Sequence, residues 1–185
     1  LEGVAYWLRY TASSVRQAHA RNQTIQAHVL VSPEDRQRLS RPHENGGVII
    51  ALPHIGDVDS AGGWVASQGY RVSSVSEHLA PEEFEYFMKV RQHLGMKIYA
   101  HDSRGVAHHL IEDLRSGAVT ALVCDRDLTG GGVPVQWPTP NGPVAVTLPA
   151  GPAYIARRAR ANLIVAITHY EGEQTRLEFS DPIPN

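Results

Sequence analysis

The sequence predicts an α/β fold with a central, mostly parallel or mixed β-sheet flanked by helices. Two observations support this prediction: short runs of branched apolar residues alternate with helical patterns, and glycine or proline separates most of them. The clearest run, residues 48–52, suits a strand buried on both faces. At 185 residues the chain fits one domain, residues 1–185. Because a helical pattern is under way at Leu1 and the chain ends directly after a strand pattern, we expect a fragment of a longer protein.

Capping and turn residues indicate the order of the elements. Ser32 and Pro33 open a short polar helix, Asp57 caps the helix after the central strand, and Pro149 opens the last helix. Gly95 ends the helix that starts at residue 81. Helices are expected at residues 1–17, 33 onward, 57–68, 81–94, 104–115 and 149–160. Strands are expected at residues 25–31, 48–52, 70–75, 96–100, 118–124, 133–137, 144–147, 162–168 and 175–179.

The first helix has an apolar face formed by Val4, Trp7, Leu8 and Val15. Such a face packs on the core, which is the interpretation we prefer, or it meets a groove or a membrane surface. Elsewhere, no run of about 18 apolar residues exists, so we expect no membrane-spanning segment, and no signal peptide is visible.

The composition excludes several classes of function. A formal net charge of -2 provides no basic field for nucleic acid, so no nucleic-acid partner is expected. The single cysteine, Cys124, rules out an internal disulfide framework and fits a reducing compartment, where we interpret it as a small buried residue. Ten histidines are present, but none has a recognised ligand spacing with a third partner, so no metal site is expected.

A histidine and two aspartates follow the central strand. Pro53 ends the strand and places His54 at its carboxyl end, where open α/β sheets commonly form ligand crevices. Asp59, five positions on, could hold one ring nitrogen of His54 while the other nitrogen acts as a general base. Alternatively, His54 bonds the helix cap Asp57 and has no further role.

A second charged motif, Asp125-Arg126-Asp127, follows another apolar strand at the same predicted edge of the sheet. Arg126 suits a phosphate or a substrate carboxylate, or it forms an ion pair within a solvated turn.

Arg91 falls on the apolar face of the helix that starts at residue 81. A buried guanidinium needs a partner or an anionic ligand, unless the side chain reaches the rim of the core. Glu77, just past the preceding strand, is the candidate partner.

Together the motifs resemble a known family. His54 and Asp59 match the His, four residues, Asp signature of glycerolipid-type acyltransferases. Further stretches sharpen the match to the bacterial acyltransferases of lipid A biosynthesis, above all to the actinobacterial phosphatidylinositol mannoside acyltransferases. These stretches are LPH (52–54), SEHLAPE (76–82), VRQHLG (90–95), CDRDL (124–128), GVPV (132–135) and LPAGPA (148–153). They run in the family's order from about Gly46 onward, while the stretch up to about Arg41 carries little of the resemblance.

The resemblance implies a role for each polar residue at this edge, on a glycerolipid acyltransferase-like fold in which residues 1–185 form a single acyltransferase domain. His54 takes the position of the general base, Asp59 that of its orienting acid, and Asp125 that of the second essential acid, where glutamate is typical of the mannoside enzymes. The polar positions that line the groove for the acceptor and coenzyme A are Glu77, Arg91 and Arg126.

The implied reaction transfers a fatty acyl group from acyl-CoA, as co-substrate, to a hydroxyl of a membrane glycolipid such as a phosphatidylinositol mannoside. No other cofactor is expected, and an apolar channel should hold the acyl chain. The family further implies a peripheral protein on the cytoplasmic face of the plasma membrane. It also implies an interfacial N-terminal region, most of which we expect to lie outside this chain.

Two other functions stay open. His54 and Asp57 superficially resemble part of the metal-ligand cluster of metal-dependent phosphoesterases, although the sequence lacks a downstream Gly-Asn-His. The other alternative is a non-catalytic lipid-binding module with a decayed site, and the intact residues His54, Asp59 and Asp125 argue against decay.

Overall fold

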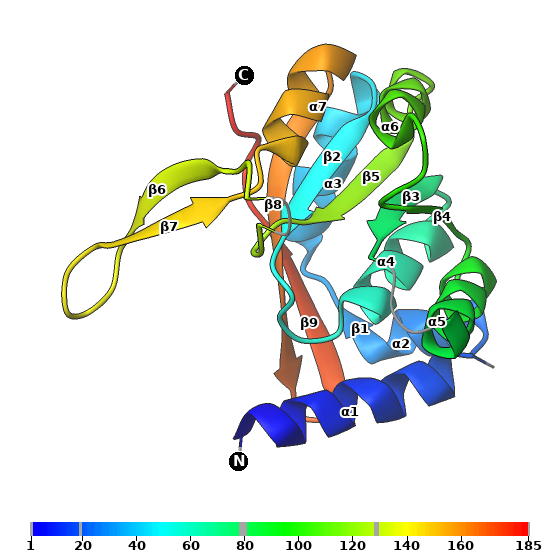
Figure 1. Cartoon of the computed structure of the whole chain (residues 1–185). Helices are drawn as coiled ribbons and strands as arrows, with labels where there is room; N and C mark the ends of the chain where they lie inside the picture. The colour runs from blue at the N-terminus through cyan, green and yellow to red at the C-terminus, as the bar shows by residue number, and fades with distance from the viewer. Residues whose placement is uncertain (1, 19, 78–80, 128–129, 185) are drawn as a thin grey trace.

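A seven-stranded sheet with the strand order β1-β9-β8-β2-β5-β3-β4 forms the centre of the computed structural model, which describes residues 2–18, 20–77, 81–127 and 130–184 (Figure 1). The strands are β1 (Val29–Leu30), β2 (Val48–Leu52), β3 (Val72–Ser76), β4 (Met96–Ala100), β5 (Val119–Val123), β6 (Val133–Trp137), β7 (Val144–Leu148), β8 (Asn162–Glu171) and β9 (Gln174–Phe179). The helices are α1 (Glu2–Gln17), α2 (Asn22–His28), α3 (Pro33–Glu44), α4 (Val58–Ser67), α5 (Pro81–His93), α6 (Val106–Arg115) and α7 (Gly151–Ala159).

The sheet is mixed, because β8 and β9 pair antiparallel while β2 pairs in parallel with both β5 and β8. The predicted α/β class with a mostly parallel or mixed sheet is therefore confirmed. Strands β6 and β7 form a separate two-stranded hairpin that projects from the body (Figure 1).

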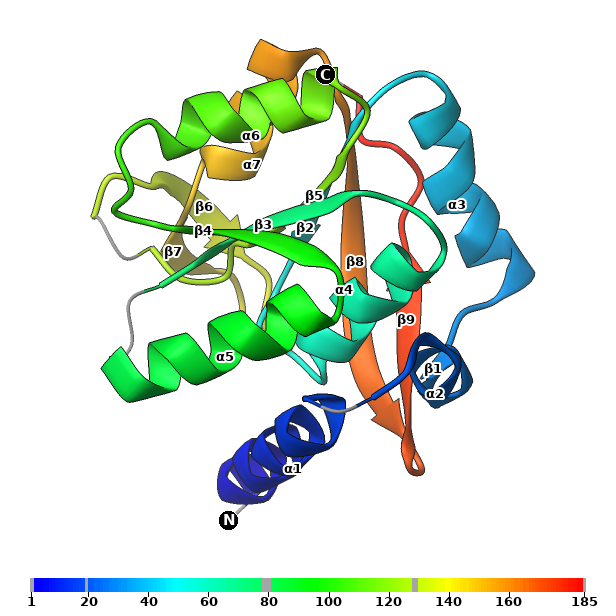
Figure 2. The ribbon, with the colours of Figure 1, turned by 90° about the vertical axis from the view of Figure 1, so that its right-hand side faces the viewer.

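Strand β2 is buried along its whole length, which explains its unbroken apolar sequence. Ile50 and Leu52 belong to the core cluster that includes Trp64 of α4. Ile49 and Ala51 belong to the second cluster, with side chains of α6 and α7. Alternate residues of one strand therefore point to two cores, and Figure 2 shows helices on both faces of the sheet.

Helix α1 packs in the opposite sense to our preferred interpretation. Val4, Leu8 and Val15 are exposed, with Val4 62% accessible, whereas Ser13 and Gln17 are buried. Gln17 donates a hydrogen bond to Asp57 at 2.9 Å, so the polar face of α1 supplies donors to a buried carboxylate of α4's cap. The prediction that the apolar face of α1 packs on the core is wrong for Val4, Leu8 and Val15. The polar face turns inward instead, because the buried carboxylate of Asp57 needs hydrogen-bond donors. The side chain of Trp7 lies outside the described residues.

The strand predicted at residues 25–31 is mostly helix. Residues 22–28 form α2, which packs on α4 and buries Ile25, and only Val29 and Leu30 form a strand. This short β1 pairs in parallel with β9. Packing of one apolar side chain has overridden the strand propensity of this segment. From α3 onward, the expected elements follow in the predicted order, with ends that differ by a few residues.

Among the described residues, no helix combines the length and the apolar character that crossing a membrane requires.

We expect Gly47→Ala to be strongly destabilising. A Cβ atom at Gly47 would lie 2.2 Å from the backbone oxygen of Leu114, so β2 and α6 would have to move apart. Overpacking of this kind lowers the free energy of unfolding by about 1–3 kcal/mol, and occasionally by more. The control is Gly151→Ala, where no atom lies within 4 Å of the added Cβ. Urea unfolding followed by circular dichroism would measure both, and equal losses would contradict this account.

Candidate active site

The ends of two neighbouring strands bring His54 and Asp125 together. Leu52 is in register with Val123 on the parallel strands β2 and β5, so the residues that follow each strand emerge side by side. His54 Nδ1 lies 2.7 Å from Asp125 Oδ1. The two side chains are 46% and 33% exposed, which places this pair at the surface of the sheet's carboxyl edge.

Asp125 is held in its ionised form. Burial raises the pKa of Asp125, but hydrogen bonds from the ring and the backbone amide of His54 outweigh it, and the net pKa is lowered. An ionised carboxylate only accepts hydrogen bonds, so Nδ1 of His54 carries the proton and donates it to Asp125. In the neutral ring, Nε2 is therefore the nitrogen that can accept a proton.

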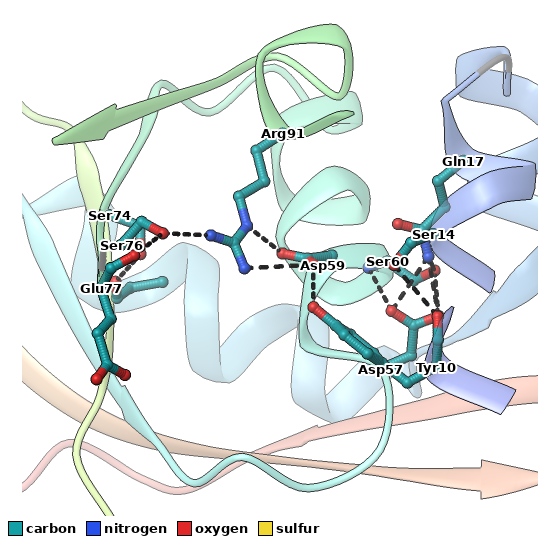
Figure 3. Close-up of polar contacts among 11 residues, drawn as sticks. Tyr10, Ser14, Gln17, Asp57, Asp59, Ser60, Ser74, Ser76, Glu77 and Arg91 are labelled. Carbon is teal, nitrogen blue, oxygen red and sulfur yellow. Dashed lines mark hydrogen bonds and ion pairs between the residues drawn. The ribbon is translucent and has the colours of Figure 1, made fainter. Parts of the chain in front are cut away.

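Asp59 does not hold the ring of His54, and the predicted hydrogen bond between them is wrong. Asp59 accepts a hydrogen bond from Arg91 Nε at 2.7 Å and one from the hydroxyl of Tyr10 at 2.5 Å (Figure 3). Arg91 also donates to Ser76 Oγ at 2.9 Å. The carboxylate is engaged by a cation and a phenol from two other helices, so it serves as a link between α1, α4 and α5.

The pair of Asp59 and Arg91 is largely buried, with side chains 5% and 19% exposed. Burial lowers the pKa of Arg91, but the charge and hydrogen bonds of Asp59 outweigh it, so the net pKa is raised. Burial raises the pKa of Tyr10, and the negative charge of Asp59 raises it further. Arg91 therefore stays cationic and Tyr10 stays a neutral donor, as the ion pair requires.

The inward direction predicted for Arg91 is confirmed, but its predicted partner is wrong. Glu77 forms an ion pair with Arg126 at 3.2 Å instead. In Figure 3 the carboxylate of Glu77 points away from Arg91, while Ser76 and Asp59 face it. The Glu77 and Arg126 side chains are 39% and 55% exposed, so this second pair lies in solvent at the sheet edge.

Asp57 is a structural cap that is fully buried. It accepts a hydrogen bond from the backbone amide of Ser60 at 2.9 Å, which satisfies the first turn of α4. The Ser13 hydroxyl and the Gln17 amide, both from α1, also bind it. The alternative in which His54 bonds Asp57 is therefore wrong.

The site opens into a cavity of about 1150 Å³ between one face of the sheet and helices α1, α4 and α5. This volume exceeds the roughly 300–1,000 Å³ of common small-molecule sites. Five of the six predicted site residues line it: His54, Asp59, Glu77, Arg91 and Arg126. The deeper walls are apolar and include Ile50, Leu52, Ala61, Val65 and Ile98. The arrangement joins an imidazole–carboxylate pair at a sheet edge to a cavity with apolar walls.

Comparison with known proteins identifies the family. The profile of the bacterial lipid A biosynthesis acyltransferases matches residues 7–181. The chain belongs to this family. Phosphatidylinositol mannoside acyltransferase of Mycobacterium tuberculosis (strain ATCC 25618 / H37Rv) is 33% identical over 132 residues, which cover 68% of this chain and 40% of that protein. The protein of the same name from Mycolicibacterium smegmatis (strain ATCC 700084 / mc(2)155) is 32% identical over 130 residues, 69% of this chain and 41% of that protein.

The resemblance predicted from the motifs is thus confirmed. The chain covers 40% and 41% of the length of these two acyltransferases. The roles expected for His54, Asp125, Glu77, Arg91 and Arg126 stay predictions, whereas Asp59 does not orient the ring of His54.

Sequence reasoning missed Tyr10 in this acyltransferase fold. The signal that could have found it is a polar stripe at helical spacing: Tyr10, Ser13, Ser14 and Gln17 recur three or four positions apart. The apolar stripe of the same helix is the more obvious pattern, and it predicts that the opposite face is buried.

Arg91→Ala should lower the free energy of unfolding by about 3–5 kcal/mol, because it leaves Asp59 as an unpaired buried charge. The matched control is Arg126→Ala, whose exposed pair with Glu77 should contribute at most about 1 kcal/mol. Chemical denaturation of both variants would measure the difference. Similar losses of unfolding free energy in the two variants would show that the buried pair contributes no more to stability than the exposed pair.

Asp125→Asn should change stability in a pH-dependent way. A carboxylate with a lowered folded-state pKa stabilises the protein fully above its unfolded pKa of about 3.9, and this contribution is lost as the pH falls through the folded-state pKa. The Tm difference between wild type and Asp125→Asn should therefore be larger above about pH 4 than in stronger acid. Calorimetry over a pH series would test this, with Asp181→Asn, at a side chain 84% exposed, as the control. A difference that grows in acid would refute it.

Proposed function

We propose that the protein transfers a fatty acyl group from acyl-CoA to a hydroxyl of a membrane glycolipid such as a phosphatidylinositol mannoside. The observation that carries the proposal is the 2.7 Å contact of His54 with Asp125 at the mouth of the apolar cavity. Membership of an acyltransferase family supports the reaction class, and the name of the mycobacterial relatives supports the acceptor.

In this mechanism His54 is the general base and Asp125 is the acid that orients it. The acceptor hydroxyl attacks the thioester carbonyl as Nε2 of His54 takes its proton. Asp125 holds the tautomer through Nδ1 and stabilises the imidazolium that forms. The tetrahedral intermediate then collapses, the carbon–sulfur bond breaks, and the imidazolium returns the proton to the leaving thiolate of coenzyme A.

Asp59 acts in this proposal as a positioning residue rather than as the partner of His54. Its carboxylate is engaged by Arg91 and Tyr10, and all three side chains line the cavity. Arg126 and Glu77, at the exposed mouth, are the groups placed to meet the charged or hydroxylated parts of the substrates. An arginine suits the phosphates of coenzyme A because it forms bidentate, charge-assisted hydrogen bonds.

We propose further that the protein acts as a peripheral protein at the cytoplasmic face of the plasma membrane. The exposed apolar side chains Val4, Leu8 and Val15 of α1 support this, because helices with such a face lie in membrane interfaces. Because the polar face of α1 binds Asp57, its apolar face points outward and is available for contact with a membrane.

His54→Ala should reduce acyl transfer about 10²–10⁴-fold without loss of the fold, as expected for a lost general base. The assay follows labelled acyl groups from acyl-CoA to a mannosylated phosphatidylinositol. The matched control is His169→Ala, because the His169 side chain is also 46% exposed and lies on β8, outside the cavity lining. Asp125→Asn should also lose rate at a retained fold, whereas Asp59→Asn should lose activity together with thermal stability.

Near wild-type transfer by His54→Ala would overturn the base assignment. Lost transfer in His169→Ala to the same extent would show that the assay reports general damage rather than base chemistry.

A further inference from the structure

The cavity follows one face of the sheet from the carboxyl edge to the amino edge. Near the mouth, Leu52 of β2 and Val123 of β5 are register partners, and both line the cavity. At the far end, Val72 is in register with Val119 on one side and with Met96 on the other, and all three line the same cavity. Strands rise about 3.3 Å per residue, so the far row lies about 13 Å below the mouth row.

At the far end, Met96 closes the gap between the sheet and α4. A Cβ atom on Gly62 of α4 would lie 2.5 Å from Met96 Sδ, so the thioether occupies the space that a side chain on α4 would otherwise fill. Met96 is 7% exposed, and Gly62 lines the cavity with it. The next glycine, Gly63, faces Leu94 instead and does not belong to the cavity lining.

We propose that Met96, seated against Gly62, is the floor of the acyl chamber and sets the longest acyl chain that the protein accepts. The inference rests on the proposed function for the identity of the ligand. An apolar chain that enters at His54 and runs along the strands meets the row of Val72, Val119 and Met96 at its end. Of these three, Met96 has the long, unbranched side chain that reaches α4, so its size decides the depth.

This account makes the two contact partners act in opposite directions. Removing the thioether in Met96→Ala deepens the chamber, so longer chains should fit. Adding a methyl group in Gly62→Ala forces Met96 away from α4 and into the chamber, so the limit should move to shorter chains.

The experiment measures calorimetric binding of a series of saturated acyl-CoA thioesters of increasing chain length, in a His54→Ala background to prevent turnover. Each methylene that enters an apolar chamber should tighten binding about fourfold, until the chain reaches the floor and the gain stops. In Met96→Ala this break should move to longer chains, so that the first chain beyond the wild-type limit binds about fourfold more tightly than to the parent. In Gly62→Ala the break should move to shorter chains.

Two matched controls make the same substitutions at positions outside the cavity lining. Met88→Ala removes the other methionine, which lies on α5 outside the cavity lining, and Gly63→Ala adds the same methyl group to the neighbouring position of α4. Neither should move the break. Circular dichroism checks each fold, and because the two test variants act in opposite directions, either one decides the proposal if the other fails to fold.

The outcomes separate this proposal from the proposed function. A break that stays at the same chain length in both variants would overturn the assignment of Met96 as the floor while leaving acyl transfer intact. A break that moves only in Phe179→Ala, at the β9 side of the cavity, would do the same. Retained transfer in His54→Ala would overturn the base while leaving a shifted break valid. Binding that is independent of chain length would overturn the floor and place the acyl chain outside the chamber.

Discussion

The buried ion pair between Asp59 and Arg91 determines how the walls of the cavity meet. Asp59 stands in the first turn of α4, Arg91 comes from α5, and Tyr10 of α1 donates to the same carboxylate. Arg91 also reaches Ser76 at the end of β3. Three helices and a strand end thus share one charged centre. Removal of either charge would leave the other uncompensated in a largely buried site, so the shape of the mouth depends on the pair.

The proposed mechanism gives Asp59 and Asp125 different tasks because their surroundings differ. The one nearer to His54 in sequence, Asp59, is 4% exposed and has an arginine and a phenol as donors. Asp125 is more exposed, and its principal donors are the ring and the backbone amide of His54. A carboxylate engaged by a guanidinium is a good anchor, whereas one that no guanidinium engages can stabilise the protonated form of an imidazole beside it. Burial of Asp57 and Asp59 also accounts for the orientation of α1. The polar face of this helix points inward because it supplies hydrogen-bond donors to these carboxylates.

The proposed acyl chamber results from the pairing of strands rather than from any one segment. Its floor and its mouth are each formed by side chains that lie far apart in the chain and become neighbours through register. Gly62 on α4 and Met96 on β4 complete it.

The sequence by itself determined the α/β class, the order of elements from α3 onward and the placement of His54 and Asp125 after buried strands, because apolar periodicity and capping residues act locally. It also showed that Arg91 faces inward. Only the tertiary structure decided which carboxylate meets the imidazole of His54. Asp59 is five residues from His54, yet Asp125, 71 residues away, holds the ring because β2 and β5 are neighbours in the sheet. The direction of α1 was likewise settled by the buried carboxylates of α4, since unpaired charge costs more than exposed apolar surface.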